Sequence, residues 1–180
     1  MLFFIRITFN LFFNLLFFFQ PIFIFVSIGS MLVGSLGAIK QVRIKRFIAY
    51  TSINQVGFIF LGLASCNLTG LTASIIYLIL YAIMSINFFT LLLNTEHIIT
   101  KKNMIYLSDL YCYCFYNFKS SQHLVLTILS MAGLPPLGGF IGKLFLYFSI
   151  MEARLDVVIV FSLVLSIISV YYYLSFVRYI

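Results

Sequence analysis

A single lysine stands in an apolar stretch, directly behind a run of prolines and glycines. The stretch reads AGLPPLGGFIGK from residue 132 to residue 143, and Lys143 is its only charged residue. Lys143 lies about eight residues before the end of the surrounding apolar segment, which at about 1.5 Å per helical residue puts it about 12 Å deep in a bilayer. A lysine at such depth costs roughly 2.5 to 3.5 kcal/mol on insertion scales, so it predicts a functional site.

The residues before Lys143 predict an interruption of the helix. Proline removes a backbone donor and glycine weakens a helix, and the interrupting residues are Gly133, Pro135, Pro136, Gly138, Gly139 and Gly142. An interrupted helix persists in a membrane only where protein buries it or water lines it. Because burial favours the neutral amine, a lysine beside such water can gain and lose a proton. The alternative, a side chain that snorkels to the interface, suits a helix end better than this depth.

The composition places these residues in a membrane protein. Of 180 residues, 63% are hydrophobic and 8% are charged, and the mean hydropathy is +1.15, which leaves too little polar surface to cover a soluble globule. We predict an all-α polytopic membrane protein of about six transmembrane helices, with the fifth helix broken near Pro135–Gly139 and residues 1–180 forming a single membrane-embedded unit. The expected helices cover residues 2–20, 22–39, 48–66, 70–94, 122–151 and 156–179, with an interfacial loop over 95–121.

The basic residues predict the orientation of these helices. One side of the six-helix arrangement carries Arg6, Lys40, Arg43, Lys45, Arg46, Lys101, Lys102, Lys119 and Arg178. Arg154 alone falls on the other side. Short loops rich in lysine and arginine stay on the side of synthesis, so both termini are expected on the positive-inside side. Loop placement also accounts for the net charge of +7 without a nucleic-acid partner.

Other chemistry finds no support in the residue pattern. The sequence has no Walker loop, no dinucleotide fingerprint and no His or Cys cluster with metal-ligand spacing. Cys112 and Cys114 flank a tyrosine, unlike a C-x-x-C motif, and Cys66 stands alone. His97 and His123 both lie near the expected interface. We therefore expect no cofactor and no metal in this chain.

Four stretches carry a resemblance to a known family. They are GSLGAIKQVRIKRFIAYTSINQVGFIFLGL from residue 34, IIYLILYAIMSINFF from residue 75, LSMAGLPPLGGFIGKLFLY from residue 129 and SVYYYLSFVRY from residue 169. In order and spacing, from about residue 22 onward, they resemble NADH dehydrogenase subunit 2, an antiporter-like proton-pumping subunit of respiratory complex I. The resemblance implies a part in proton translocation coupled to electron transfer from NADH to ubiquinone, and membership of that enzyme without a catalytic centre in this chain.

The resemblance also implies roles for particular residues. Lys143 matches the terminal protonatable residue of a half-channel, on a broken helix. Tyr77 and Tyr81, four residues apart, match a polar pair that is histidine in the larger sister subunits. The polar start of the helix after the basic loop is matched by Thr51, Ser52, Asn54 and Gln55. For these two polar groups, hydrogen bonding that holds the helices together is an equal alternative to proton conduction.

The family's upstream half has no counterpart in this sequence. That half has its own broken helix, an intramembrane glutamate and two further lysines. We therefore expect a separate polypeptide to supply it, as from a split gene, alongside other complex I membrane-arm subunits and lipids. NADH, FMN, iron–sulfur clusters and quinone would belong to partner subunits. The high Phe, Ile and Tyr content and the lack of a presequence favour a multi-pass protein of the mitochondrial inner membrane.

Two other functions stay open at this point. The chain could be a structural remnant that completes the packing of the membrane arm without conducting protons. It could also be a fragment of a stand-alone cation/proton antiporter, which shares these motifs. Lys143 in its interrupted helix favours proton translocation over the first of these.

We expect the loop at residues 40–46 to face the positive-inside side only. A membrane-impermeant amine reagent added to sealed, oriented membranes should modify Lys45 from that side, because clustered basic residues resist translocation. The measurement is mass spectrometry of the labelled peptides. Modification of Lys45 from the opposite side would contradict the predicted order of spans.

Overall fold

The computed structural model describes residues 2, 5, 16–93, 106–110 and 118–180. Within these ranges the chain forms six α-helices, one 3₁₀ turn and no strand longer than an isolated bridge between Arg43 and Tyr106. The elements are α2 (Leu16–Ile39), α3 (Ile44–Ala64), α4 (Leu68–Leu93), η2 (Leu107–Leu110), α6 (Phe118–Ala132), α7 (Gly138–Glu152) and α8 (Asp156–Val177). The prediction of an all-α membrane fold is confirmed.

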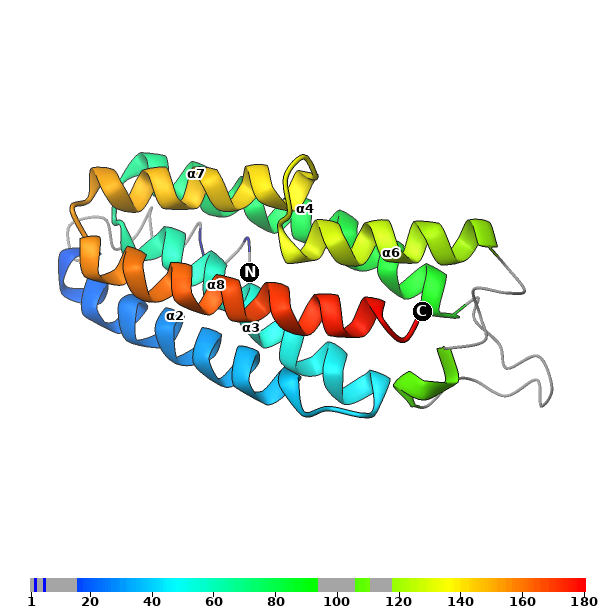
Figure 1. The fold of residues 1–180 in the computed structure, drawn as a ribbon. Helices are drawn as coiled ribbons and strands as arrows, with labels where there is room; N and C mark the ends of the chain where they lie inside the picture. The colour runs from blue at the N-terminus through cyan, green and yellow to red at the C-terminus, as the bar shows by residue number, and fades with distance from the viewer. Residues whose placement is uncertain (1, 3–4, 6–15, 94–105, 111–117) are drawn as a thin grey trace.

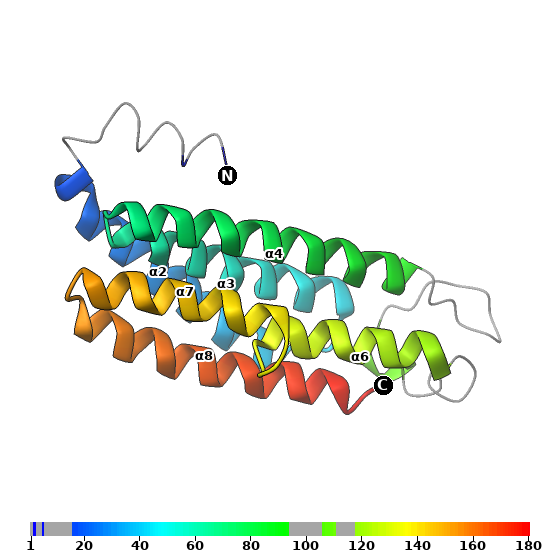
Figure 2. The ribbon, with the colours of Figure 1, turned by 90° about the horizontal axis from the view of Figure 1, so that it is seen from above.

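The helices lie side by side in one elongated bundle, with α6 and α7 placed end to end (Figures 1 and 2). Helix α2 packs along α3, α4 packs against both α6 and α7, and α8 contacts α2, α6 and α7. Within the described residues, α2, α3, α4 and α8 are each long and apolar enough to cross a membrane. Helices α6 and α7 have 15 residues each, or about 22 Å, so they need each other to cross about 30 Å of hydrocarbon.

The break in the fifth predicted helix is confirmed. The predicted helix over residues 122–151 is divided into α6 and α7 by the segment 133–137. Helix α6 also begins earlier than predicted, at Phe118, inside the segment expected to be a loop. The other predicted helix ends from residue 39 onward agree with the structure to within about one turn.

The predicted boundary at Pro21 is wrong. The proline lies inside α2, which begins at Leu16, rather than between helices at 2–20 and 22–39. Near a helix start the missing donor removes one hydrogen bond only, so an apolar helix can continue through it. The greater part of the first predicted helix, with Arg6, lies outside the described residues.

The two ends of the bundle differ in charge. One end holds the turn after α2, the starts of α3 and α6 and the end of α8, and we call it the basic end. It carries Lys40, Arg43, Lys45, Arg46, Lys119 and Arg178. Arg154 lies at the opposite end, between α7 and α8, together with Glu152 and Asp156. Lys101 and Lys102 lie outside the described residues. The helix order therefore gathers the described basic residues as the sequence predicts.

Close helix contacts depend on small residues. A Cβ atom on Gly34 of α2 would lie 2.6 Å from the backbone nitrogen of Asn54 on α3, so only glycine permits this approach. Small residues at helix contacts are the usual means of packing inside a membrane. Large apolar side chains such as Phe25, Ile86 and Ile167 remain exposed on the outer faces. The bundle is thus packed inside and apolar outside.

We expect Gly139→Ala to destabilise the break and Gly138→Ala to leave it intact. A Cβ on Gly139 would collide with the carbonyl oxygen of Ser130, whereas a Cβ on Gly138 would meet nothing within 4 Å. Overpacking of this kind costs about 1–3 kcal/mol. Thermal unfolding of the purified protein, followed by circular dichroism, should show a lower midpoint for Gly139→Ala only. Equal midpoints for the two variants would contradict the packing described.

Candidate functional site

The Lys143 side chain is buried beside the break between α6 and α7. Only 5% of its surface is exposed. Its Nζ donates a hydrogen bond to the carbonyl oxygen of Ala132 at 2.8 Å and lies 4.7 Å from the ring centroid of Phe58 on α3. The amine therefore turns into the bundle instead of snorkelling to the interface. Glu152 and Asp156 are the nearest described carboxylates in sequence. They lie at the end of the bundle opposite the basic end.

Gly133 directly follows α6, and the last two carbonyl groups of the helix, those of Met131 and Ala132, receive no backbone hydrogen bond. Gly133 donates its N–H to the carbonyl oxygens of Leu129 at 3.2 Å and Ser130 at 3.0 Å. Its φ of +80° lies in the left-handed region that favours glycine. The last carbonyls of a helix lack donors within the helix and carry the negative end of its dipole. The end of α6 is therefore suited to a positive charge.

Side chains from two other helices donate hydrogen bonds to those carbonyl oxygens. Gln55 Nε2 on α3 donates to the carbonyl oxygen of Met131 at 3.2 Å, and the Lys143 amine takes the next carbonyl, that of Ala132. Gln55 and Lys143 thus bind neighbouring carbonyl groups on one helix end. The interruption of the helix is what supplies both acceptors.

Gln55 also connects this helix end to a line of buried tyrosines. Its Oε1 accepts a hydrogen bond from the Tyr77 hydroxyl on α4, and its Nε2 lies 3.1 Å from the Tyr173 hydroxyl on α8. The rings of Tyr172 and Tyr173 have centroids 4.6 Å apart. Asn54 Nδ2 donates to the Tyr172 hydroxyl at 3.0 Å. The network joins α3, α4 and α8 to the end of α6 through side chains that are almost fully buried.

Phe58 and Tyr77 bring the amine and the network together. The two rings have centroids 5.8 Å apart, and the Lys143 amine lies over the Phe58 ring. A Cβ on Gly142 would lie 2.8 Å from Cδ2 of Tyr77, so Tyr77 packs on the α7 backbone directly before Lys143. Lys143, Tyr77, Gln55 and Asn54 therefore belong to one buried region.

The remaining predicted site residues lie around this buried region or within the break itself. Tyr81 is half-buried and packs against a second core cluster around Phe176 and Leu124. The hydroxyls of Thr51 and Ser52 donate to the carbonyls of Ile48 and Ala49 on their own helix, at 2.9 and 2.8 Å, and Thr51 is buried whereas Ser52 is half-buried. Among the residues of the predicted break, Gly133, Pro135 and Pro136 form the interruption, and Gly138 and Gly139 begin α7.

Sequence reasoning missed three side chains of this region. Tyr172 and Tyr173 appear in the sequence only as part of a run of tyrosines, and Phe58 appears as one apolar residue among many. The tyrosine run did hold a signal, because a buried tyrosine hydroxyl needs a hydrogen-bond partner. Those partners are Asn54 and Gln55, adjacent residues of another helix.

We expect Tyr173→Phe to lower stability and Tyr171→Phe to leave it unchanged. Tyr173 is 2% exposed and loses its hydroxyl contact with Gln55, whereas Tyr171 is 58% exposed. Loss of one buried hydrogen bond costs about 0.5–1.5 kcal/mol. The thermal midpoint of the purified protein measures the difference. Tyr173→Phe with a midpoint equal to that of Tyr171→Phe would show that the Tyr173 hydroxyl adds nothing to stability.

Comparisons with known proteins agree with this fold. Residues 1–169 match the NADH:quinone oxidoreductase/Mrp antiporter transmembrane family. Subunit N of NADH-quinone oxidoreductase from Pelagibacter ubique is 34% identical over 97% of this chain and 37% of its own length. Chain 2 of NADH-ubiquinone oxidoreductase from Marchantia polymorpha is 33% identical over 88% of this chain and 31% of its own length. The chain thus spans about a third of these relatives.

Two solved structures are similar as well. The Mrp complex from Dietzia sp. DQ12-45-1b aligns with 88% of this chain and 29% of the matched chain, with 25% identity and a TM-score of 0.78. Respiratory complex I from Thermus thermophilus with bound aureothin aligns with 88% of this chain and 35% of the matched chain, with 26% identity and a TM-score of 0.72. The resemblance carried by the four sequence stretches is confirmed. The chain belongs to the NADH:quinone oxidoreductase/Mrp antiporter family of transmembrane proteins.

Proposed function

We propose that this chain takes part in proton translocation in the membrane arm of a respiratory NADH:quinone oxidoreductase, with Lys143 as a proton-transfer group. One observation carries the proposal: a buried amine rests on the carbonyl end of an interrupted helix, and Glu152, the nearest described carboxylate in sequence, lies at the other end of α7. The named relatives are subunits of NADH-quinone and NADH-ubiquinone oxidoreductases, which supports this setting.

The surroundings of Lys143 stabilise both forms of its amine. The Ala132 carbonyl, the dipole of α6 and the Phe58 ring favour the ammonium ion. Burial without a counter-charge favours the neutral amine. Because these effects oppose each other, a change of charge nearby can shift the balance and move a proton. This is the property that a loading site for protons requires.

The polar residues around Lys143 have a positioning role in this proposal. Amide groups do not ionise, so Gln55 and Asn54 orient neighbouring groups instead of storing protons. The hydroxyls of Tyr77 and Tyr173 hydrogen-bond Gln55 and can also hydrogen-bond entering water, so they can link the two. We assign Tyr81 to the same path because it lies one helical turn after Tyr77. Thr51 bonds both its own helix and the Tyr173 side chain and belongs to the same path. Ser52 bonds its own helix and contributes through packing.

We infer that redox chemistry belongs to other subunits, which hold NADH, FMN, iron–sulfur clusters and quinone. The described residues contain no group of His, Cys, Asp and Glu side chains that could hold a metal ion. The exposed apolar faces of α2, α4 and α8 suit contacts with lipid and neighbouring membrane-arm subunits. The helices that the longer relatives possess would come from the same protein or, as with a split gene, from another polypeptide.

We place the protein in the mitochondrial inner membrane. The chain 2 relative from Marchantia polymorpha and the Phe-, Ile- and Tyr-rich composition support this location. Bacterial subunits N are equally similar, so the sequence identity alone favours neither membrane.

Two observations favour other functions. The hydrogen bond from Lys143 to Ala132 also caps α6, as a purely structural lysine would. The similarity to an Mrp complex favours a cation/proton antiporter. Both alternatives differ from the proposal in what they require of Lys143 and of NADH oxidation.

We expect Lys143→Met and Lys143→Arg both to reduce proton pumping without preventing assembly. Methionine keeps the volume of the side chain and relieves the cost of a buried charge. Arginine keeps the charge but cannot release its proton at accessible pH. Lys119→Met, at the exposed start of α6, is the matched control. The measurement is protons pumped per NADH oxidised in membranes that contain the assembled complex.

The pattern across the variants separates the three functions. A structural lysine predicts that arginine is tolerated and that methionine impairs assembly. An antiporter predicts ion exchange that continues without NADH. Normal pumping in both Lys143 variants would rule out the proposed role.

A further inference from the structure

An aromatic ring lies where a buried amine would usually have a counter-charge. Lys143 Nζ lies over the ring of Phe58 on α3, 4.7 Å from its centroid, and Phe58 is fully buried. The face of an aromatic ring carries partial negative charge, and a cation within about 6 Å of the centroid is attracted to it. Glu152, the nearest described carboxylate in sequence, lies at the other end of α7. The ring is therefore a neutral group in the position of a counter-ion.

Contacts of α3 with its neighbours hold the ring in this position. Asn54, one helical turn before Phe58, donates a hydrogen bond to the Tyr172 hydroxyl on α8 at 3.0 Å. Next to Phe58, a Cβ on Gly57 would lie 2.6 Å from Met31 Cγ, so α2 packs directly on the α3 backbone. If α3 turned about its axis, the hydrogen bond and this close contact would both be lost. The ring is thus held by α2 and α8 and does not depend on the amine for its position.

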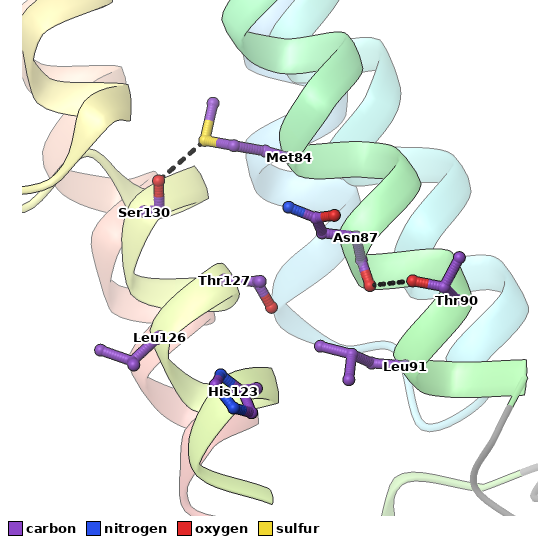
Figure 3. A pocket seen from close by; sticks show the side chains of 8 residues that line it. All are labelled: Met84, Asn87, Thr90, Leu91, His123, Leu126, Thr127 and Ser130. Atoms are coloured by element: carbon purple, nitrogen blue, oxygen red, sulfur yellow. Dashed lines mark hydrogen bonds between the residues drawn. The ribbon is translucent and has the colours of Figure 1, made fainter. Parts of the chain in front are cut away.

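Helix α4 supports the same ring and also contacts the end of α6. The ring centroids of Tyr77 and Phe58 lie 5.8 Å apart, with the ring planes inclined by 51°, and the Tyr77 hydroxyl donates to Gln55. Met84, about two turns further along α4, accepts a hydrogen bond at its Sδ from the Ser130 hydroxyl on α6 at 2.9 Å (Figure 3). The helix that packs on the ring is therefore joined to the helix that binds the amine, which fixes the ring and the amine relative to each other.

We propose that Phe58 is a positioning residue for proton transfer at Lys143, and that its ring acts as a weak counter-ion that sets the ratio of ammonium ion to neutral amine. The proposal rests on the proposed function of Lys143 and deepens it. A carboxylate at this distance would hold the amine in its charged form, because a buried ion pair that loses one charge leaves the other unpaired. The attraction of a ring is weaker. The amine is therefore stabilised while it carries a proton and can still release it.

The other titratable groups near the amine are tyrosines from three helices: Tyr77 on α4, Tyr147 on α7 and Tyr173 on α8. An ordinary phenol ionises at about pH 10, so these hydroxyls contribute dipoles and no net charge near neutral pH. His123 lines a cavity of about 410 Å³ between α4 and α6, nearer the basic end than Ser130 (Figure 3). Because this imidazole also titrates near neutral pH, the test must observe the lysine nitrogen itself.

Fluorination of the ring tests its charge with little change in its size. In pentafluorophenylalanine the fluorine atoms draw electron density from the ring face, so the attraction for a cation is lost. The changes are Phe58→pentafluorophenylalanine and, as the matched control, Phe60→pentafluorophenylalanine, each within the assembled complex. Phe60 lies on the same helix and packs on the ring of Phe23 on α2, with centroids 6.3 Å apart. The measurement is nitrogen-15 NMR of the Lys143 side chain as a function of pH.

We expect fluorination at Phe58 to lower the ratio of ammonium ion to neutral amine about tenfold at a given pH, since a desolvated cation–π contact is strong enough to change an equilibrium constant by this factor. The control at Phe60 should leave the ratio unchanged. An equal ratio in the Phe58 variant and the unmodified protein overturns the proposal alone. An ammonium signal that stays constant with pH in every form overturns the proposed function together with it.

Proton pumping as a function of pH separates positioning from packing. Phe58→Leu removes the ring face and keeps a buried apolar side chain, and Phe60→Leu is the control. Because the amine binds a proton less tightly without the ring, pumping per NADH oxidised should be lost about one pH unit lower on the alkaline side in Phe58→Leu than in Phe60→Leu. A lower thermal midpoint in Phe58→Leu without this change in the pH profile is the result of packing alone and overturns the proposal.

Discussion

A buried amine needs acceptors, and the interrupted helix supplies them. Lys143 can bond the Ala132 carbonyl only because α6 ends at that point and frees its last carbonyls. Gly133 allows the sharp exit from α6, and Gly139 lets α7 restart against the same helix end. The prolines and glycines that weaken the helix are therefore required by the lysine that follows them. The lysine would be costly in a membrane without these acceptors, and the break is tolerated because surrounding helices bury it.

The rest of the bundle is arranged around that helix end. Adjacent amides on α3, Asn54 and Gln55, bond adjacent tyrosines on α8, Tyr172 and Tyr173. Gln55 also bonds Tyr77 on α4 and the carbonyl next to the one held by Lys143. A hydrogen-bonded network of this kind fixes the relative rotation of the helices, because each buried polar group loses its partner if one helix turns. A change of charge at Lys143 therefore acts on groups whose positions are firmly held.

Local sequence patterns predicted the membrane class, most spans and the break, because each depends on hydropathy or on Pro and Gly. The helix that runs through Pro21 was not predictable in this way, since tolerance of a proline depends on its distance from the helix start. The pairing of Asn54 with Tyr172 was not predictable either, because it joins residues 118 positions apart. Whether Thr51 or Ser52 faces the core depends on helix rotation, which tertiary packing decides. Composition and spacing contain none of this information.

The central claim is that the Lys143 nitrogen gains and loses a proton inside the membrane. The most direct measurement is nitrogen-15 NMR of lysine side chains in the assembled complex, with Lys143→Arg used to assign the signal. The account predicts signals from both the ammonium ion and the neutral amine, in a ratio that changes with pH. A single ammonium signal that stays constant across pH would contradict it.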